Sequence, residues 1–130
     1  MNRKILTTVL SLFCLTCFAQ SDKVDMRSLL RTMPDDVFPL LTHNNILDFI
    51  DFLASDMKAE VDNRLGGKSE MTMLCDSACH IRLTSVSEAD VRLVSADGKQ
   101  SVEVTHVYHA GETKSSSTTV YTLDWNKPNK

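Results

Sequence analysis

The feature that most constrains the fold is the stretch 44–74, where a helical repeat gives way to an alternating one across a pair of glycines. Apolar residues in 46–57 recur at the three- and four-residue spacing that places them on one side of a helix. Asn44 or Asn45 can begin this helix, because an asparagine oxygen accepts a free backbone N–H of the first turn. Gly66-Gly67 then breaks an extended segment. The chain is therefore predicted to join an amphipathic helix to a β-hairpin.

A shorter helix is predicted before this stretch. Apolar residues in 26–33 share helical spacing, Asp25 is placed to cap them, and Pro34 cannot continue a helix. The apolar segment 37–41 that follows is predicted to form one buried helical turn.

From Glu70 onward the apolar residues recur every second position, which is the period of a half-buried strand. Connections as short as Asp97-Gly98 favour antiparallel neighbours, since a parallel pair needs a crossover of a dozen or more residues. One apolar face per strand indicates a sheet that is covered on one side. The predicted class is therefore α+β, with N-terminal helices packed on one face of an antiparallel meander sheet.

The first nineteen residues read as a secretory signal peptide. Arg3-Lys4 precedes an apolar run over 5–18, and Cys17 and Ala19 are the small residues expected before a cut after Ala19. Residues 20–130 are then a single α+β domain without a transmembrane segment, exported to the periplasm or outside the cell. In an alternative, Cys17 is lipidated and anchors a lipoprotein, although Cys14-Leu15-Thr16 matches that processing site poorly.

Charge argues against one class of partner. Removing Arg3 and Lys4 but no acidic residue lowers the formal net charge from -3 to -5. Nucleic-acid binding requires a basic surface, so no nucleic-acid partner is expected.

Two cysteines remain after the signal peptide, in the sequence Cys75-Asp-Ser-Ala-Cys79. Export places them in an oxidising compartment, and they flank a short loop between two strand-like runs, so Cys75 and Cys79 are a candidate disulfide. The alternative is two free thiols in a turn. A metal site needs two ligands more than this pair, and only His80 is adjacent.

The histidines are the other candidates for chemistry. His106 and His109 are three residues apart, which on a strand places them on opposite faces. His80 and His106 can meet only if the strand register allows it, and His43 is expected in a loop. The sequence holds no nucleophile motif, so no catalytic residue, metal or cofactor is assigned.

The last predicted strand, Thr118–Trp125, is a candidate interaction edge. Tyr121, Leu123 and Trp125 share one of its faces, and no later element covers its far side. Unpaired edges recruit another strand, which predicts self-association or pairing with an envelope protein. In the alternative, this strand lies between two others.

Several segments together resemble a known family. They are M-P-D at Met33–Asp35, L-T-x-N-N at Leu41–Asn45, L-D-F-I-D-F at Leu47–Phe52, A-E-V-x-N-R-L-G-G-K-S at Ala59–Ser69, H-x-R-L-T-S at His80–Ser85 and Y-x-L-D-W at Tyr121–Trp125. This combination resembles an uncharacterised exported family of Bacteroidales, domain of unknown function 3256. The resemblance implies export and an α+β fold, and it implies no activity. It also implies further strands beyond Trp125, so that this chain is expected to be a shortened member.

Two classes of function follow as expectations. The first is a non-catalytic exported binding or protein-interaction module of the bacterial cell envelope. The alternative is a small periplasmic hydrolase or metal-dependent enzyme that uses His80, His106 and nearby carboxylates. A concave pocket with convergent polar groups favours the enzyme, and an unpaired edge favours the binding module.

Overall fold

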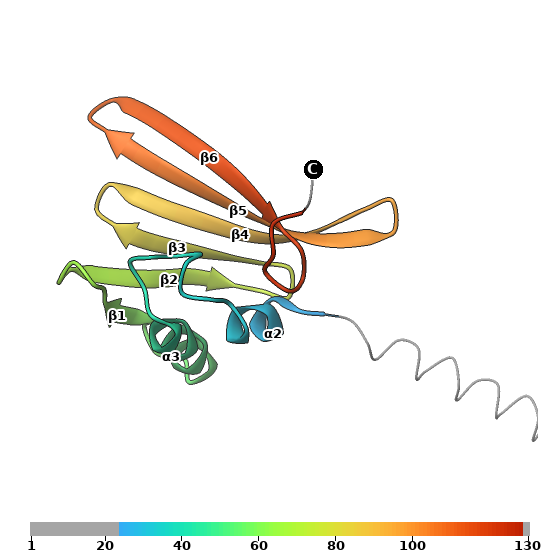
Figure 1. Ribbon diagram of the computed structural model, residues 1–130. Helices are drawn as coiled ribbons and strands as arrows, with labels where there is room; N and C mark the ends of the chain where they lie inside the picture. The colour runs from blue at the N-terminus through green and yellow to red at the C-terminus, as the bar shows by residue number, and fades with distance from the viewer. Residues whose placement is uncertain (1–23, 129–130) are drawn as a thin grey trace, which may run out of the picture.

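The computed structural model describes residues 24–128, within which two helices precede six strands (Figure 1). The helices are α2 (Met26–Arg31) and α3 (His43–Ala54), and the strands are β1 (Glu60–Asp62), β2 (Lys68–Leu74), β3 (Ala78–Thr84), β4 (Ser87–Ala96), β5 (Lys99–Ala110) and β6 (Thr113–Tyr121). The strands form one sheet in chain order, and every neighbouring pair is antiparallel. The predicted α+β class and antiparallel meander are confirmed, with mostly β structure. The predicted signal peptide lies outside the described residues.

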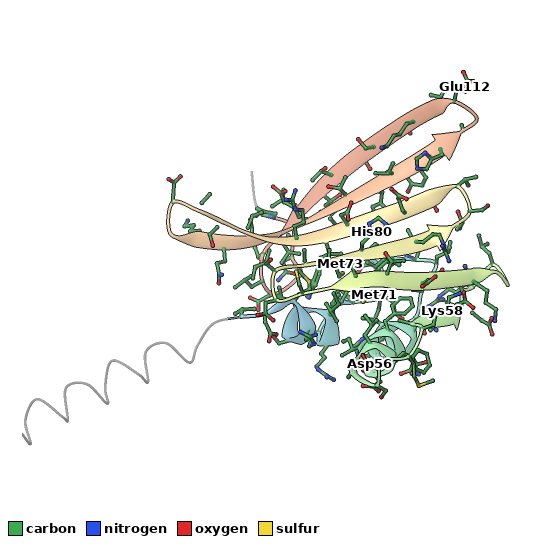
Figure 2. The ribbon with its side chains drawn as sticks, turned by 180° about the vertical axis from the view of Figure 1, so that it is seen from behind. Asp56, Lys58, Met71, Met73, His80 and Glu112 are labelled. Atoms are coloured by element: carbon green, nitrogen blue, oxygen red, sulfur yellow. The ribbon has the colours of Figure 1, made fainter. Side chains whose placement is uncertain are left out.

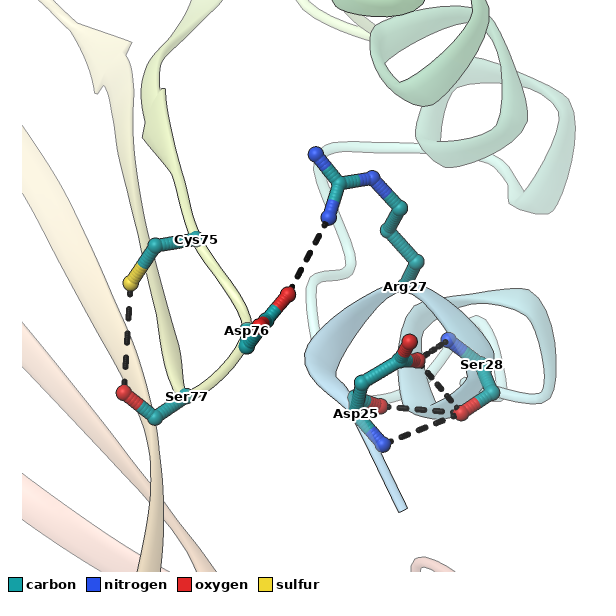
Figure 3. A network of polar contacts seen from close by, with 6 residues as sticks. All are labelled: Asp25, Arg27, Ser28, Cys75, Asp76 and Ser77. Carbon is teal, nitrogen blue, oxygen red and sulfur yellow. Dashed lines mark hydrogen bonds and ion pairs between the residues drawn. The ribbon is translucent and has the colours of Figure 1, made fainter. Parts of the chain in front are cut away.

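Helix α2 is fixed at its first turn. The Asp25 carboxylate accepts the backbone N–H of Ser28 at 2.9 Å, as predicted for a cap (Figure 3). The backbone N–H of Met26 donates to the carbonyl of Asp76 at 2.7 Å, in the turn between β2 and β3. The start of α2 is therefore bonded directly to the sheet.

Helix α3 begins before the asparagines that were predicted to cap it. Thr42 is the cap: its hydroxyl accepts the Asn45 N–H at 3.1 Å, and the Asn45 side chain accepts the Thr42 N–H at 2.9 Å. This reciprocal pair satisfies two free donors and moves the start to His43, which was expected in a loop. Segment 37–41 forms hydrogen-bonded turns and no helix, although Val37, Phe38 and Leu41 are buried as expected.

The register defines two faces of the sheet. Met71, Ile81, Ala89 and His106 stand in one row across β2 to β5. We call the face that carries this row the core face, because its buried residues belong to one cluster with those of α2 and α3. The opposite side is the outer face. The core cluster includes Leu30, Phe49, Met71, Ile81, Val91, Val104 and Trp125.

A register shift in β2 separates Met71 and Met73, which the two-residue period after Glu70 places on one face. Met71 faces Ile81 and is 1% exposed, whereas Met73 faces His80 and is 42% exposed. The shift adds a residue between them, and one extra residue turns the following side chain to the other face. Met73 therefore lies on the outer face beside His80 (Figure 2).

A buried polar cluster joins the turn after β1 to β3. The Asn63 side-chain amide donates to the Ser69 hydroxyl at 3.0 Å and to the Leu83 carbonyl at 3.3 Å. Its oxygen accepts the backbone N–H groups of Leu65 and Gly67 at 3.0 and 3.1 Å. One side chain thus fixes the turn and attaches it to a strand two positions away in the sheet.

Candidate functional site

Strand β6 is an edge of the sheet. It pairs with β5 over the whole of Thr113–Tyr121, and within residues 24–128 no strand lies on its other side. Its side chains from Thr113 to Thr118 are exposed on both faces, and Lys114 is its only charged residue. The opposite edge, β1, spans three residues and contacts α3. Of the two edges, β6 is the long and accessible one.

The hairpin of β5 and β6 extends away from the helices. The main sheet contacts of α3 are with β1 and β2, at the opposite end of the strand order. Figure 2 shows Glu112 at the tip of this hairpin, far from Asp56, which follows α3. The core-face residues Ser115 and Ser117 are exposed as a result.

The pattern of the β5–β6 pairing identifies the backbone groups that point outward. The N–H of His109 donates to Val86 at 2.8 Å, on the β4 side, so His109 and its partner Lys114 do not exchange hydrogen bonds. Antiparallel pairs alternate between bonded and non-bonded, so the non-bonded residues of β6 are the even-numbered ones. Lys114, Ser116, Thr118 and Val120 therefore present their N–H and C=O groups at the free edge.

The chain after β6 turns into the core and does not extend the edge. Trp125 has a left-handed backbone conformation, φ 63°, and is 6% exposed. Its indole N–H donates to the carbonyl of Leu29 at 2.9 Å, and its ring lies 5.6 Å from that of Tyr121. The predicted strand Thr118–Trp125 is therefore displaced, since β6 spans Thr113–Tyr121: the prediction begins five residues too late and ends four residues too late.

The three predicted edge side chains have internal roles in the structure. Trp125 belongs to the core, and Tyr121 and Leu123 are partly buried against it. The accessible part of β6 instead begins at Thr113 and includes the serine-rich run 115–117, which lacks the apolar alternation used to recognise strands. The glycine of the preceding turn, Gly111 at φ 63°, was the available signal that a hairpin starts there.

The outer face carries pairs of opposite charge. Arg82 contacts Glu70 at 2.7 Å, and Lys68 contacts Asp62. The Nδ1 atom of His80 lies 2.7 Å from Asp90, in the row that joins β3 to β4. Arg82 and Lys68 therefore have carboxylate partners within the sheet.

His80 and His106 do not come together. His80 pairs with Asp90 on the outer face, whereas His106 lies on the core face, opposite Ala89. The ring of His106 packs edge-on against Phe38 at 5.4 Å and stacks on Tyr108 at 6.1 Å. Burial lowers the pKa of His106, which favours the neutral ring. His106 and His109 lie on opposite faces, as predicted.

Cys75 and Cys79 are free thiols in the structure. Cys79 lies on the core face opposite Leu74, whereas Cys75 pairs with Ala78 and its Sγ lies 3.9 Å from the Ser77 hydroxyl (Figure 3). Burial raises the pKa of Cys79 to about 12, and hydrogen bonds from Ser77 lower the pKa of Cys75. Cys75 follows Leu74, so its side chain points to the face opposite that of Cys79. A disulfide requires both side chains on one side of the strand pair, and it stays a prediction.

Open depressions on the described part of the sheet include the following two. One, of about 460 Å³, lies between the turns after β1 and β3 and is lined by Asn63, Leu65, Gly67, Lys68, Arg82, Thr84 and Ser85. The other, of about 370 Å³, is lined by Met73, Ala78, Asp90, Arg92 and Thr105. Lys68 and Arg82 are already paired with carboxylates, so the larger depression offers no unpaired charge from them.

Within residues 24–128, no cluster of three or more histidine, cysteine, aspartate or glutamate side chains is arranged to hold a metal ion. Neither described helix is long and apolar enough to cross a membrane.

Comparison with known proteins agrees with the fold and gives no activity. A solved structure described as "Structure of a domain of an uncharacterized protein from Porphyromonas gingivalis W83" matches with a TM-score of 0.66 at 17% identity, over 79% of this chain and 52% of that chain. The similarity at this identity shows the fold alone, and the chain spans about half the length of that relative. No curated protein matches the chain. Residues 18–129 match the family described as "Protein of unknown function (DUF3256)", and the chain therefore belongs to that family.

Proposed function

We propose that the chain is a non-catalytic, exported interaction module of the bacterial cell envelope, which binds an extended segment of a partner along β6. The observation that carries this proposal is a nine-residue edge strand, exposed on both faces over Thr113–Thr118, with a single charge. Proteins usually protect an edge of this kind with several charges, a proline, a bulge or a covering element. An edge left open is suited to adding a strand.

The position of the helices supports the same proposal. In the proposed arrangement, α2 and α3 cover the core face from β1 towards β4, and no helix covers the β5–β6 hairpin. The contacts of α3 with β1 and β2, and the exposure of Ser115 and Ser117, support this arrangement. A partner strand at β6 then meets no helix on either face.

The chemistry of β6 favours recognition through the backbone. The outward N–H and C=O groups of Lys114, Ser116, Thr118 and Val120 supply hydrogen bonds that any extended segment can match. The short hydroxyl side chains beside them add cross-strand hydrogen bonds and little steric hindrance. Such an edge selects an extended conformation more than a particular sequence.

Replacing Ser116 by proline tests the role of this edge. The proline removes an outward N–H while the bonded pairs of β6 with β5 stay intact, so partner binding should fall at least tenfold. Ser116→Ala is the matched control, because it removes the hydroxyl and keeps the N–H. The readout is cross-linked partner recovered from the cell envelope, together with amide exchange of 113–120. Equal partner recovery by the proline and alanine variants, with both folded by far-UV circular dichroism, contradicts the proposal.

Export is tested separately from binding. Its support is the Arg3-Lys4 pair, the apolar run and the small residues Cys17 and Ala19. N-terminal sequencing of protein from the cell envelope should begin at Gln20 or Ser21. A full-length chain that keeps its first fifteen residues in the cytosol contradicts export.

A further inference from the structure

We infer that the strand which β6 binds is β6 of a second copy, in an antiparallel pair centred on Ser117. This inference rests on the proposed function, because it names the partner of the same edge. It makes one continuous sheet from two copies related by a two-fold axis perpendicular to the sheet. That axis keeps the two core faces on the same side, so odd-numbered residues must face odd-numbered ones.

The first support is the match of backbone groups. With Ser117 on the axis, Lys114 faces Val120 of the second copy, and Ser116 faces Thr118. Each residue that points its N–H and C=O outward therefore meets another of the same kind, and antiparallel partners of this kind exchange both hydrogen bonds. A shift of the axis to Ser116 or Thr118 brings Glu112 or Thr122 into the ladder. The Thr122 N–H is already bonded to the Asn126 carbonyl at 2.7 Å.

The second support is charge complementarity on the outer face. In the centred pairing, the stem of Lys114 lies over Val120 of the second copy, which is 39% exposed in the single chain. Beyond Val120 in the same row stands Glu103. The two residues are two strand spacings apart, about 10 Å between Cα atoms, which an extended lysine and a glutamate can bridge. The lysine thus covers apolar surface and directs its ammonium group to a carboxylate.

The third support is the absence of conflict at the axis. Lys114 is the only charged residue of β6, and the pairing places it opposite Val120 and away from Lys114 of the second copy. On the core face Ser115 faces Thr119, and Ser117 faces Ser117, so hydroxyls meet hydroxyls. No like charges or bulky side chains oppose one another directly.

A pair of charge variants at Ser117 tests this register. Ser117 is exposed, so Ser117→Lys and Ser117→Asp should leave each chain folded. In the dimer each variant places like charges in a directly opposed, non-bonded pair, about 4.5 Å between Cα atoms. Sedimentation velocity of the exported protein should show a dimer for the parent and at least tenfold weaker association for either variant. An equimolar mixture of the two variants should recover the dimer.

A matched control and a reversal complete the experiment. Ser115→Lys adds the same charge two residues away on the same face, opposite Thr119 of the second copy, and should retain the dimer. Lys114→Glu should weaken it, because it brings a carboxylate towards Glu103. A parent that is monomeric throughout the concentration series, or Ser117 variants that dimerise like the parent, overturns the second copy as partner.

The outcome also separates the two proposals. If the parent is monomeric and Ser116→Pro still abolishes recovery of an envelope partner, the edge binds another protein and only the second-copy inference fails. If the Ser116→Pro variant and its alanine control recover equal amounts of partner, the proposed function fails as well.

Discussion

At the scale of single residues, Asn63 shows how one buried amide organises two strands. It is 8% exposed and bonds to Ser69, to Leu83 and to the backbone of its own turn. Without it, the N–H groups of Leu65 and Gly67 lose their acceptor. Partly buried donors without acceptors cost free energy, because folding removes them from water without replacing their hydrogen bonds.

Asn63→Ala is therefore expected to lower the free energy of unfolding by about 2–3 kcal/mol. Urea unfolding followed by circular dichroism measures the change. Asp62→Ala is the control, since it removes an exposed ion pair next in sequence and should change stability little. Equal stability of the two variants would show that the amide network is not a major support of this turn.

The two cysteines are expected to differ sharply in reactivity. Cys75 is exposed and hydrogen bonds from the backbone N–H and the hydroxyl of Ser77 lower its pKa, whereas Cys79 is buried and burial raises its pKa to about 12. The thiolate is the reactive form, so in a chain of residues 20–130 a thiol reagent at neutral pH should label one cysteine when the protein is folded and two after unfolding. Mass spectrometry of the labelled, unreduced protein identifies the sites. No labelling even after unfolding would instead reveal the disulfide suggested by export.

At the scale of elements, the segment after β6 connects the end of the sheet to α2. Its anchor is Trp125, whose indole N–H reaches the last turns of α2 through the Leu29 carbonyl. The core ends of β6 and α2 are therefore held together, while the tip of the β5–β6 hairpin is not. This difference divides β6 into an anchored end near Tyr121 and an accessible remainder.

Trp125→Phe should lower the free energy of unfolding by about 2 kcal/mol, because it leaves the Leu29 carbonyl without its donor and a gap beside Tyr121. Trp125 is the only tryptophan, so the parent's emission reports its burial directly. Emission should be blue-shifted in the folded parent and move to the red as the protein unfolds. Tyr108→Phe, at a side chain that is 49% exposed, is the control and should change stability little.

At the scale of the whole molecule, the protection of backbone amides from hydrogen exchange is expected to fall from the central strands to β6. The fully buried residues Ile81, Val91 and Val104 lie in β3, β4 and β5, whereas β6 is exposed over most of its length. Regions with few buried apolar contacts open at lower cost, so their amides exchange faster. The central strands are thus expected to resist local opening, and the β6 edge is expected to open more readily.

Hydrogen exchange at concentrations that keep the chain monomeric checks this gradient. The outward amides of Lys114, Ser116 and Thr118 should exchange first, and those of Ile81 and Val91 last. Raising the concentration into the range of the dimer should slow the first group and leave the second unchanged. Uniform exchange across β3 to β6 would contradict both the gradient and the open edge.

The features that the sequence predicts are those that depend on interactions between residues close together in the chain. The helical spacing of 46–57 predicted α3, and Asp97-Gly98 predicted a hairpin turn in which both residues have positive φ, 53° and 76°. Alternation after Glu70 predicted strands, and the short connections between them predicted antiparallel pairing. These features depend on residues a few positions apart, so the sequence determined them by itself.

Tertiary structure decided the features that depend on distant partners. Trp125 reads as the end of a strand, but a carbonyl ninety-six residues away holds it in the core. Met73 and Cys75 have the spacing of a regular strand, but the pairing of β2 with β3 shifts the register and turns their side chains outward. The last strand was expected at an edge of the sheet, but its accessible part is 113–118, because Tyr121, Leu123 and Trp125 pack against the core. The sequence by itself determined the two helices and the apolar alternation of β2 to β5, because those preferences are local, but it did not place the serine-rich strand β6. Only the tertiary structure decided which faces are buried and which edge stays open, because both depend on contacts between segments far apart in the chain.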